Sequence, residues 1–381
     1  MRLTFLPIFL FLFVLGCTIG VGNAVYPPEA DLQAQPPIGK NDDGKDLRVL
    51  VANGLSETIS LIERTDGVWK TEPNILPTGS SPNQLVVRGK TAYLVNSLSN
   101  SIQIIDLDSM TTIREISTGA GTNPMSIEFV DDERAFVTCY ISNDVRFIDL
   151  EDNVPPENMI VAKIPLPSGD DLPRDEGVSK TYARPGGMAI VDETCYVACS
   201  NLESYHVAGG PGVLVEIDIN DLSIKQTHVL TGRDTISVLH SARFPDRLVV
   251  ISAGSYTPET GFDGNGAVES IDLSSGEIFQ AINVDGAPFN GVIGPDDILY
   301  MENGKESKIL RADLHEGKQL EGFNLPTYGE NLSYASAILS CSGLLLVTNF
   351  NADRFYIINP DDGDLLAELQ TGDGPDVLAF F

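Results

Sequence analysis

The feature of this sequence that most limits its fold is a unit that recurs along almost the whole chain. The segments AYLVNSLSNSIQIIDL (92–107) and AFVTCYISNDVRFIDL (135–150) match position for position, and 47–63 and 344–360 follow the same pattern. Each unit is a β-rich run that ends in a small polar residue, then a short turn, then a second run that ends in Asp or Asn. Repetition of this kind is typical of architectures in which each copy is one supersecondary unit.

The polar residue that ends the first run of each unit marks seven copies, three of them more degenerate and located at 195–219, 248–273 and 299–314. The steps between successive markers are 43, 43, 60, 53, 51 and 46 residues. Apolar residues alternate with period two, and no long stretch has helical periodicity, so the sequence predicts an all-β protein. The seven markers are Asn53, Asn96, Cys139, Cys199, Ser252, Asn303 and Asn349.

Seven units between residues 46 and 381 average about 48 residues each, which is enough for a four-stranded antiparallel sheet and hence for one blade of a β-propeller. The array begins in mid-blade at Leu47 and ends in mid-blade with GPDVLAFF (374–381). We therefore predict a seven-bladed β-propeller in which the C-terminal strand pairs with the N-terminal half-blade and closes the ring. Such pairing leaves no open sheet edge at the seam.

The strings AYLVN, AFVTC, CYVAC and LLVTN resemble the YVTN-type repeat of bacterial envelope and archaeal surface-layer β-propellers, and the strands after them end in strings such as IIDL, FIDL and IINP. The resemblance covers nearly everything after residue 45 and implies a propeller fold. Relatives with this architecture include envelope binding proteins, lactonases and the propeller domains of redox enzymes. The resemblance therefore indicates a fold without selecting a function.

The first 24 residues are typical of an export signal, because Arg2 precedes an apolar stretch that is too short to span a membrane. Two processing sites compete. VLGC (14–17) resembles a bacterial lipobox, in which Cys17 would be lipidated, whereas GNA (22–24) resembles an ordinary signal-peptidase site. We favour the lipobox and predict a protein of the cell envelope that meets the membrane only through a lipid anchor.

Residues 25–45 contain four prolines and no hydrophobic periodicity, which predicts an extended tether before the propeller at 46–381. The chain has 24 Lys and Arg against 54 Asp and Glu, a formal net charge of −30, so its surface should repel nucleic acid. The excess is spread along the chain, which fits salt adaptation or solubility better than a cation-binding tail. We expect a monomer that binds an unknown envelope protein or ligand.

The longer steps result from insertions at 166–187, 201–212 and 254–266, on consecutive units. In a propeller, the loop that enters the innermost strand and the loop after the second strand open on the same face, so these insertions should converge on one sector. Aromatic and charged loop residues on a rigid ring form a predicted binding surface, although loops also tolerate insertions without function. Its candidate residues are Tyr182, Arg184, Tyr205, His206, Tyr256, Glu259, Phe262 and Asp263.

Two recurring sets of polar residues are expected to have structural roles. The aspartates that end the second run should cap the following turn by accepting hydrogen bonds from nearby backbone amides. They are Asp106, Asp149, Asp218, Asp272 and Asp313. The seven markers should also line one rim of the channel as repeated polar groups.

No cofactor and no metal site is predicted. Cys139, Cys195, Cys199 and Cys341 are interpreted as small buried residues, with a soft-metal site at Cys139 and Cys199 as the alternative. The sequence contains no CxxC or CxxCH, no HExxH and no GxSxG, so haem attachment, zinc hydrolysis and serine hydrolysis lack motif support. DGNG (263–266) has calcium-like donors but not the full loop, and we interpret it as a turn.

Two functions therefore compete. The first is a non-enzymatic, lipid-anchored envelope propeller that acts as a binding scaffold, which the missing motifs favour. The second is a lactonase-like hydrolase with its site at the channel mouth. A redox subunit is a weaker third reading, because haem motifs are absent.

Overall fold

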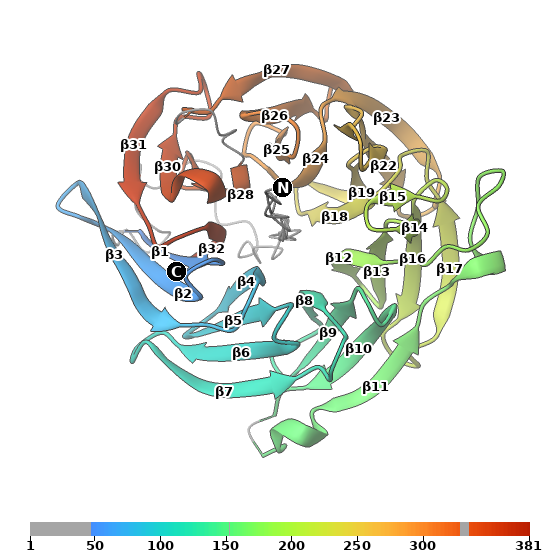
Figure 1. Cartoon of the computed structure of the whole chain (residues 1–381), viewed down its shortest axis with the longest axis horizontal. Helices are drawn as coiled ribbons and strands as arrows, with labels where there is room; N and C mark the ends of the chain where they lie inside the picture. Colours follow the sequence, from blue (N-terminus) through green and yellow to red (C-terminus); the bar gives the residue numbers. More distant parts are fainter. Residues whose placement is uncertain (1–46, 152, 328–334) are drawn as a thin grey trace, which may run out of the picture.

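The computed structural model describes residues 47–151, 153–327 and 335–381, which form seven four-stranded antiparallel sheets around a central axis (Figure 1). The prediction of an all-β, seven-bladed propeller is confirmed. The export signal, Cys17 and the tether lie outside the described residues, so the predictions for them stay predictions. Within the described ranges, no helix has both the length and the apolar character needed to cross a membrane.

Blades 1 to 3 contain the N-terminal strands, and the strand named first in each blade lies nearest the axis. Blade 1 consists of β32 (Pro375–Phe380), β1 (Arg48–Asn53), β2 (Thr58–Thr65) and β3 (Val68–Pro77). Blade 2 consists of β4 (Pro82–Arg88), β5 (Thr91–Asn96), β6 (Ser101–Asp106) and β7 (Thr111–Ser117). Blade 3 consists of β8 (Pro124–Phe129), β9 (Arg134–Cys139), β10 (Asp144–Asp149) and β11 (Ile160–Pro165).

Blades 4 to 7 follow the same order from the axis outwards. Blade 4 consists of β12 (Pro185–Val191), β13 (Thr194–Cys199), β16 (Val213–Asp218) and β17 (Ile224–Val229). Blade 5 consists of β18 (Thr235–Ser241), β19 (Phe244–Ser252), β22 (Asn265–Asp272) and β23 (Ile278–Asp285). Blade 6 consists of β24 (Pro288–Ile293), β25 (Ile298–Asn303), β26 (Lys308–Asp313) and β27 (Lys318–Asn324). Blade 7 consists of β28 (Ala335–Cys341), β29 (Leu344–Asn349), β30 (Arg354–Ile358) and β31 (Leu365–Gln370).

The insertions add small elements to this ring. Two hairpins are formed by β14 (Leu202–Ser204) with β15 (Val207–Ala208) and by β20 (Tyr256–Thr257) with β21 (Gly261–Phe262). Short 3₁₀ turns occupy Pro156–Asn158, Gly169–Asp171 and Phe350–Ala352.

The C-terminal strand closes the ring as predicted. In Figure 1 the red strand β32 lies beside the blue strand β1, and the two pair antiparallel with Leu50 opposite Ala379. The side chains of β32 contribute to both neighbouring cores. Val377 packs with residues of blades 1 and 2, whereas Leu378 packs with residues of blades 7 and 1. Because stacked blades bury both faces of each sheet, the closing strand stabilises two inter-blade interfaces at once.

The turn aspartates have the structural role expected of them. In each of five blades the carboxylate accepts a hydrogen bond from the backbone amide two or three residues later, which caps the turn to the outermost strand. The pairs are Ser109 N to Asp106 at 2.7 Å, Glu151 N to Asp149 at 3.0 Å, Asn220 N to Asp218 at 2.8 Å, Ser275 N to Asp272 at 2.8 Å and Glu316 N to Asp313 at 2.8 Å.

Each innermost strand has a register irregularity near its start, so that one or two residues lie outside the regular ladder. A β-bulge redirects the side chain of the extra residue. We call these residues the bulge positions; they are Asn83, Met125, Gly186 and Gly187, Ile236, Phe289 and Asn290, Ser336 and Asp376.

Candidate functional site

The three insertions converge, and we call the surface formed by residues 166–187, 201–212 and 254–266 the insertion sector. The first and second insertions join at Tyr182, which forms bridges with both Ser168 and Leu202. The Tyr182 amide donates to the Leu202 carbonyl, and the Leu202 amide donates to the Tyr182 carbonyl, both at 3.0 Å. Backbone pairing therefore fixes the first insertion against the second.

Aromatic rings join the second insertion to the third. The His206 ring lies 5.9 Å from the ring of Tyr256 and 5.5 Å from that of Phe262, measured between centroids. Phe289, from the bulge position of blade 6, lies 6.1 Å from His206 and 5.3 Å from Phe262. Tyr205 covers the other side of His206 at 4.4 Å. We call these five residues the aromatic cluster; most of its contacts have the tilted or edge-to-face geometry that aromatic pairs prefer.

The His206 ring forms a hydrogen bond with a buried carboxylate. Its Nδ1 lies 2.7 Å from Asp234 Oδ2, and both side chains are almost fully buried. Asp234 is the residue that enters β18, so this hydrogen bond ties the second insertion to blade 5. Both residues have a positive φ, 53° for His206 and 51° for Asp234, which non-glycine residues adopt at some cost. The contact therefore compensates a local strain.

An ion pair joins the first insertion to blade 5. Arg233 Nη1 and Nη2 lie 2.6 and 2.9 Å from the two carboxylate oxygens of Asp175. The hydrogen bonds from Arg233 lower the pKa of Asp175 below its usual value. The pair is partly exposed, so its contribution is mainly geometric: a bidentate fork fixes orientation better than a single contact.

The predicted surface residues form two groups and two outliers. Tyr205, His206, Tyr256 and Phe262 lie together in the aromatic cluster. Tyr182 and Arg184 form a second group with Tyr140, because the Arg184 guanidinium lies 4.7 Å from the Tyr182 ring and 5.2 Å from the Tyr140 ring. The two outliers, Glu259 and Asp263, are exposed residues of the third insertion.

Asp263 has a turn role. Its Oδ1 accepts hydrogen bonds from the amides of Asn265 at 2.9 Å and Ser255 at 3.3 Å. This arrangement agrees with the interpretation of DGNG as turn chemistry.

Exposure separates a supporting layer from a contact layer. His206 and Phe262 are buried, whereas Tyr256 and Tyr182 are half-buried and Tyr205 is 50% exposed. The sector therefore presents a few rings on a packed base. Sequence reasoning missed Phe289, Asp234 and Tyr140. Phe289 follows Pro288 at the start of an innermost strand, and the Pro that begins five of these strands was the available signal for it. Asp234 precedes Thr235, where that pattern is absent.

The seven markers, which were predicted to line a rim of the channel, are buried residues of the blades. All seven markers end the second strand of their blade, one strand away from the axis, and all are buried. Some of their polar groups bond inside the blade, as Asn53 Nδ2 donates to Ser60 Oγ at 2.9 Å and Asn349 Nδ2 donates to the Tyr356 hydroxyl at 3.2 Å. The Oδ1 atoms of Asn53 and Asn349 are buried and have no hydrogen-bond partner among the described residues. The bulge positions, on the innermost strands, lie closer to the channel.

The bulge positions make the two sides of the ring different. On blades 3, 5 and 6, Met125, Ile236 and Phe289 belong to one apolar cluster with Phe262. On blade 1 the same position holds Asp376, which is buried, and its carboxylate makes no hydrogen bond or ion pair with any described residue. Burial raises the pKa of Asp376 well above its usual value. An apolar sector thus stands across the ring from a buried acid.

The four cysteines in the described part of the chain are free and buried, as the sequence interpretation stated. Burial raises the pKa of Cys139 to about 12 and that of Cys199 further, so both are thiols near neutral pH. Cys139 packs between blades 2 and 3, whereas Cys199 packs between blades 3 and 4, so they do not form one site. Among the residues described, no three His, Cys, Asp or Glu side chains are grouped as a metal site.

The fold and its insertions define the class: a seven-bladed β-propeller with one elaborated sector. A scan of protein-family models finds no match, and no curated protein matches. Solved structures do match. A Bacteroides fragilis protein provisionally assigned as a 6-phosphogluconolactonase has a TM-score of 0.62 at 14% identity, covering 88% of this chain and 98% of that one.

Two further structures are similar. Hydrazine synthase of Kuenenia stuttgartiensis has a TM-score of 0.58 at 17% identity, covering 76% of this chain and 86% of that chain. A catalytically inactive variant of Staphylococcus aureus virginiamycin B lyase, solved with quinupristin, has a TM-score of 0.56 at 18% identity, covering 76% and 84%. These proteins have different functions, so at such identities the similarity establishes the fold alone.

Proposed function

We propose that this protein is an extracytoplasmic, lipid-anchored β-propeller of the YVTN-repeat type that acts as a binding scaffold in the cell envelope, and that the insertion sector is its binding surface. The observation that carries the proposal is the convergence of three separate insertions into one packed sector. Loops that only tolerate insertions have no reason to be fixed to one another by backbone pairing, ring stacking and a bidentate ion pair.

The chemistry of the sector suits a macromolecular or amphipathic partner. Tyr205 is exposed, and Tyr182 and Tyr256 are half-buried on a base that does not have to be ordered on binding. Rigid aromatic side chains give contact area at low entropic cost, and tyrosine and arginine are enriched at the energetic centres of interfaces. Arg184 supplies the charged component within the same sector.

The direct test removes the contact layer and keeps the supporting layer. A Tyr182→Ser, Tyr205→Ser double variant should melt as the wild type does, since neither side chain is buried, but should lose the envelope partner that the wild type captures from detergent-solubilised membranes. A matched control changes Leu98 and Ile113, which are exposed apolar residues of blade 2, to Ser. Equal capture by the wild type and the Tyr variant would place the binding surface elsewhere.

The anchor has its own test. Labelled palmitate should enter the wild type and be lost in Cys17→Ser, because lipidation requires that thiol. Label that persists in Cys17→Ser would exclude this lipid site, and release of the wild type into the medium after cleavage at GNA (22–24) would favour the ordinary signal-peptidase site.

A lactonase-like hydrolase is the second candidate, favoured by the similarity to the Bacteroides fragilis protein and by the buried acid at Asp376. A buried carboxyl with a raised pKa on an innermost strand is a candidate general acid or base. If the protein is an enzyme of this kind, purified wild type should open 6-phosphogluconolactone faster than Asp376→Asn does. Equal rates, at the level of the uncatalysed reaction, would remove this candidate.

A further inference from the structure

Four of the turns that enter an innermost strand share a Thr-Gly pair, and three of these turns are held in the same way. In blade 2 the amide of Gly79 donates to Gln103 Oε1 at 3.3 Å. In blade 5 the amide of Gly232 donates to Glu269 Oε2 at 3.0 Å, and in blade 1 the amide of Gly372 donates to Ser60 Oγ at 3.1 Å. The blade's own third strand therefore supplies a side-chain acceptor for the incoming turn.

The acceptors occupy one structural position. Each lies two residues after the residue that pairs with the marker of its blade, as Ser101 pairs with Asn96 in blade 2 and Ala267 pairs with Ser252 in blade 5. In blade 3 the marker Cys139 pairs with Asp144, so the corresponding position holds Arg146. A guanidinium has five N–H donors and no acceptor, so Arg146 cannot bind the glycine amide of its turn.

The turn of blade 3 differs accordingly. Thr118 and Pro124 are six residues apart, compared with four for Thr78 and Pro82 in blade 2. The amide of Gly119 donates to Ser117 Oγ at 3.1 Å instead of to the third strand. Gly119 has a φ of +92°, in the region that favours glycine.

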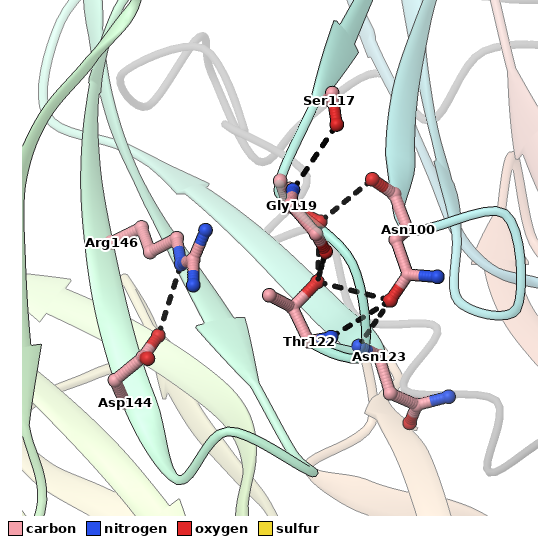
Figure 2. Close-up of polar contacts among 8 residues, drawn as sticks. Asn100, Ser117, Gly119, Thr122, Asn123, Asp144 and Arg146 are labelled. Atoms are coloured by element: carbon pink, nitrogen blue, oxygen red, sulfur yellow. Dashed lines mark hydrogen bonds and ion pairs between the residues drawn. The ribbon is translucent and has the colours of Figure 1, made fainter.

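The turn is nevertheless well held, by Asn100 of blade 2. Asn100 Oδ1 accepts hydrogen bonds from the amides of Thr122 at 2.8 Å and Asn123 at 3.0 Å, and Thr118 Oγ1 donates to the Asn100 carbonyl at 2.8 Å (Figure 2). The turn therefore does not depend on Arg146 for its conformation.

Arg146 is left with unused donors. Its side chain is only 6% exposed, and its Nε donates to Asp144 Oδ1 at 3.1 Å. Nη1 and Nη2 have no hydrogen-bond acceptor among the described residues. In Figure 2 the guanidinium lies between Asp144 and the Gly119 turn. The side chain is largely removed from water and these two nitrogens have no acceptor in the described protein, so a bound acceptor would be favourable there.

Gly119 borders the guanidinium. A Cβ at Gly119 would stand 3.2 Å from Arg146 Nη1, so the glycine keeps a side chain away from this nitrogen. The guanidinium lies at the junction of blades 2 and 3, on the face where turns enter the innermost strands.

We propose that Arg146 and the turn at 118–122 form a binding site for a small oxyanion, a carboxylate or a phosphate group, whose oxygens accept from Nη1 and Nη2. The planar guanidinium fork matches the two oxygens of such a group. Asp144 orients the fork from the Nε side and leaves the outer edge for the ligand. The bound oxyanion lies between the turn and the third strand, where Gln103, Glu269 and Ser60 act as acceptors in their own blades, and it accepts from the guanidinium.

The experiment measures the melting temperature of the full-length mature protein at constant ionic strength while sodium phosphate, sodium acetate or sodium chloride replaces a large organic buffer salt. We expect a saturable rise in melting temperature with phosphate, acetate or both, and none with chloride alone, since a ligand that binds only the folded state stabilises it. Calorimetric titration with the active anion should give one site per chain. A response to phosphate only or to acetate only identifies which source of the oxyanion the site accepts.

The decisive variant is Arg146→Gln, which installs the acceptor that blade 2 uses at the same position, and it should abolish the anion response. Arg88→Gln removes the same charge from a partly exposed residue that pairs with Asp132, and it should keep the full response. If Arg146→Gln does not fold, Arg146→Lys keeps the charge without the fork and should weaken anion binding by about tenfold or more.

Three results would overturn the proposal. They are no anion response in the wild type, an equal response in the wild type and Arg146→Gln, or an equal response to chloride and to the oxyanions. The last two would indicate a general salt effect on an acidic protein rather than a built site.

Discussion

The seam of the ring, formed by blades 7, 1 and 2, and the insertion sector over blades 4 and 5 are held together in different ways. At the seam, β32 pairs with β1 and places Val377 and Leu378 in two inter-blade cores, as an innermost strand does in every blade. In the insertion sector, Asp175–Arg233 and His206–Asp234 are contacts that have no counterpart among the described residues of the other blades. One region is stabilised by a repeated interaction and the other by interactions made once.

The difference teaches where function is expected in a repeat protein. Repeated contacts build the ring and must be kept in all copies, whereas contacts made once are free to specialise. Arg146 belongs to the second kind although it occupies a repeated position. In blades 1, 2 and 5 the residue at this position accepts a hydrogen bond from the turn glycine, which an arginine cannot do.

The largest effect is expected from opening the seam. Deleting 374–381 removes β32, exposes the apolar faces beside Leu50 and Leu346, and leaves β1 as an unpaired edge. Burial of three apolar side chains of β32 alone contributes about 5 kcal/mol to the free energy of unfolding. The melting temperature of the deletion variant should therefore fall sharply, or the variant should aggregate. The control removes only Phe381, which lies beyond the end of β32 and whose backbone amide donates to the Arg48 carbonyl. This deletion should have a small effect. A deletion variant that melts with the wild type would contradict the closed ring.

The second effect concerns the insertion sector. His206→Ala removes the ring at the centre of the aromatic cluster and leaves the buried Asp234 carboxylate without its hydrogen bond. We expect a loss of about 3 kcal/mol in the free energy of unfolding, measured by urea denaturation. Tyr205→Ala, at a 50% exposed ring, is the matched control and should cost far less. Similar losses for the two variants would mean that the cluster is not organised around His206.

The propeller, its blade number and its seam were predictable from sequence because each rests on a pattern that is copied along the chain. Asp272 could be assigned to turn capping for the same reason, since four other blades repeat it. The convergence of the insertions also followed from topology, because the faces on which propeller loops open are set by strand order.

The contacts inside the insertion sector were not predictable in the same way. His206 and Asp234 are 28 residues apart and occupy unrelated positions in their units, so no repeated pattern in the sequence indicates that they pair. Repetition identified Asn53 and Asn349 as equivalent, but it did not indicate that both side chains are buried. The bulges at Phe289 and Asp376 leave no periodic signal in the sequence.

A smaller effect, and one that depends on pH, is expected at Asp376, the one acidic residue among the bulge positions. Because burial raises its pKa in the folded protein, the protonated form is favoured there. The contribution of Asp376 to the free energy of unfolding should be greatest when the pH is below 3.8, the ordinary pKa of an aspartate. It should fall as the pH rises towards the pKa in the folded protein. Asp376→Asn should therefore raise the melting temperature at pH 7 by a few degrees and change it little below pH 4.

The control for Asp376 is Asp171→Asn, a change at an exposed aspartate of the first insertion. It should leave the melting temperature nearly unchanged at both pH values. A wild type and an Asp376→Asn variant with parallel pH profiles would mean that the carboxyl is solvated in the native protein.

The smallest effect is expected at a turn that repetition alone explains. Asp272 accepts four hydrogen bonds from the amides and hydroxyls of Ser274 and Ser275, and these bonds lower its pKa to about 2. The contribution of the Asp272 carboxylate to stability should be complete when the pH is above 3.8, the ordinary pKa of an aspartate. It should be lost as the pH falls towards 2. Asp272→Ala should lower the melting temperature at pH 7 by about one degree, because the turn is exposed and four other blades keep their caps. Asp272→Asn keeps an acceptor oxygen without the charge, so the difference between wild type and Asp272→Asn should shrink between pH 4 and pH 2. A drop as large as that of His206→Ala would show that a single repeated cap matters as much as a contact made once, and would remove the distinction between the two regions.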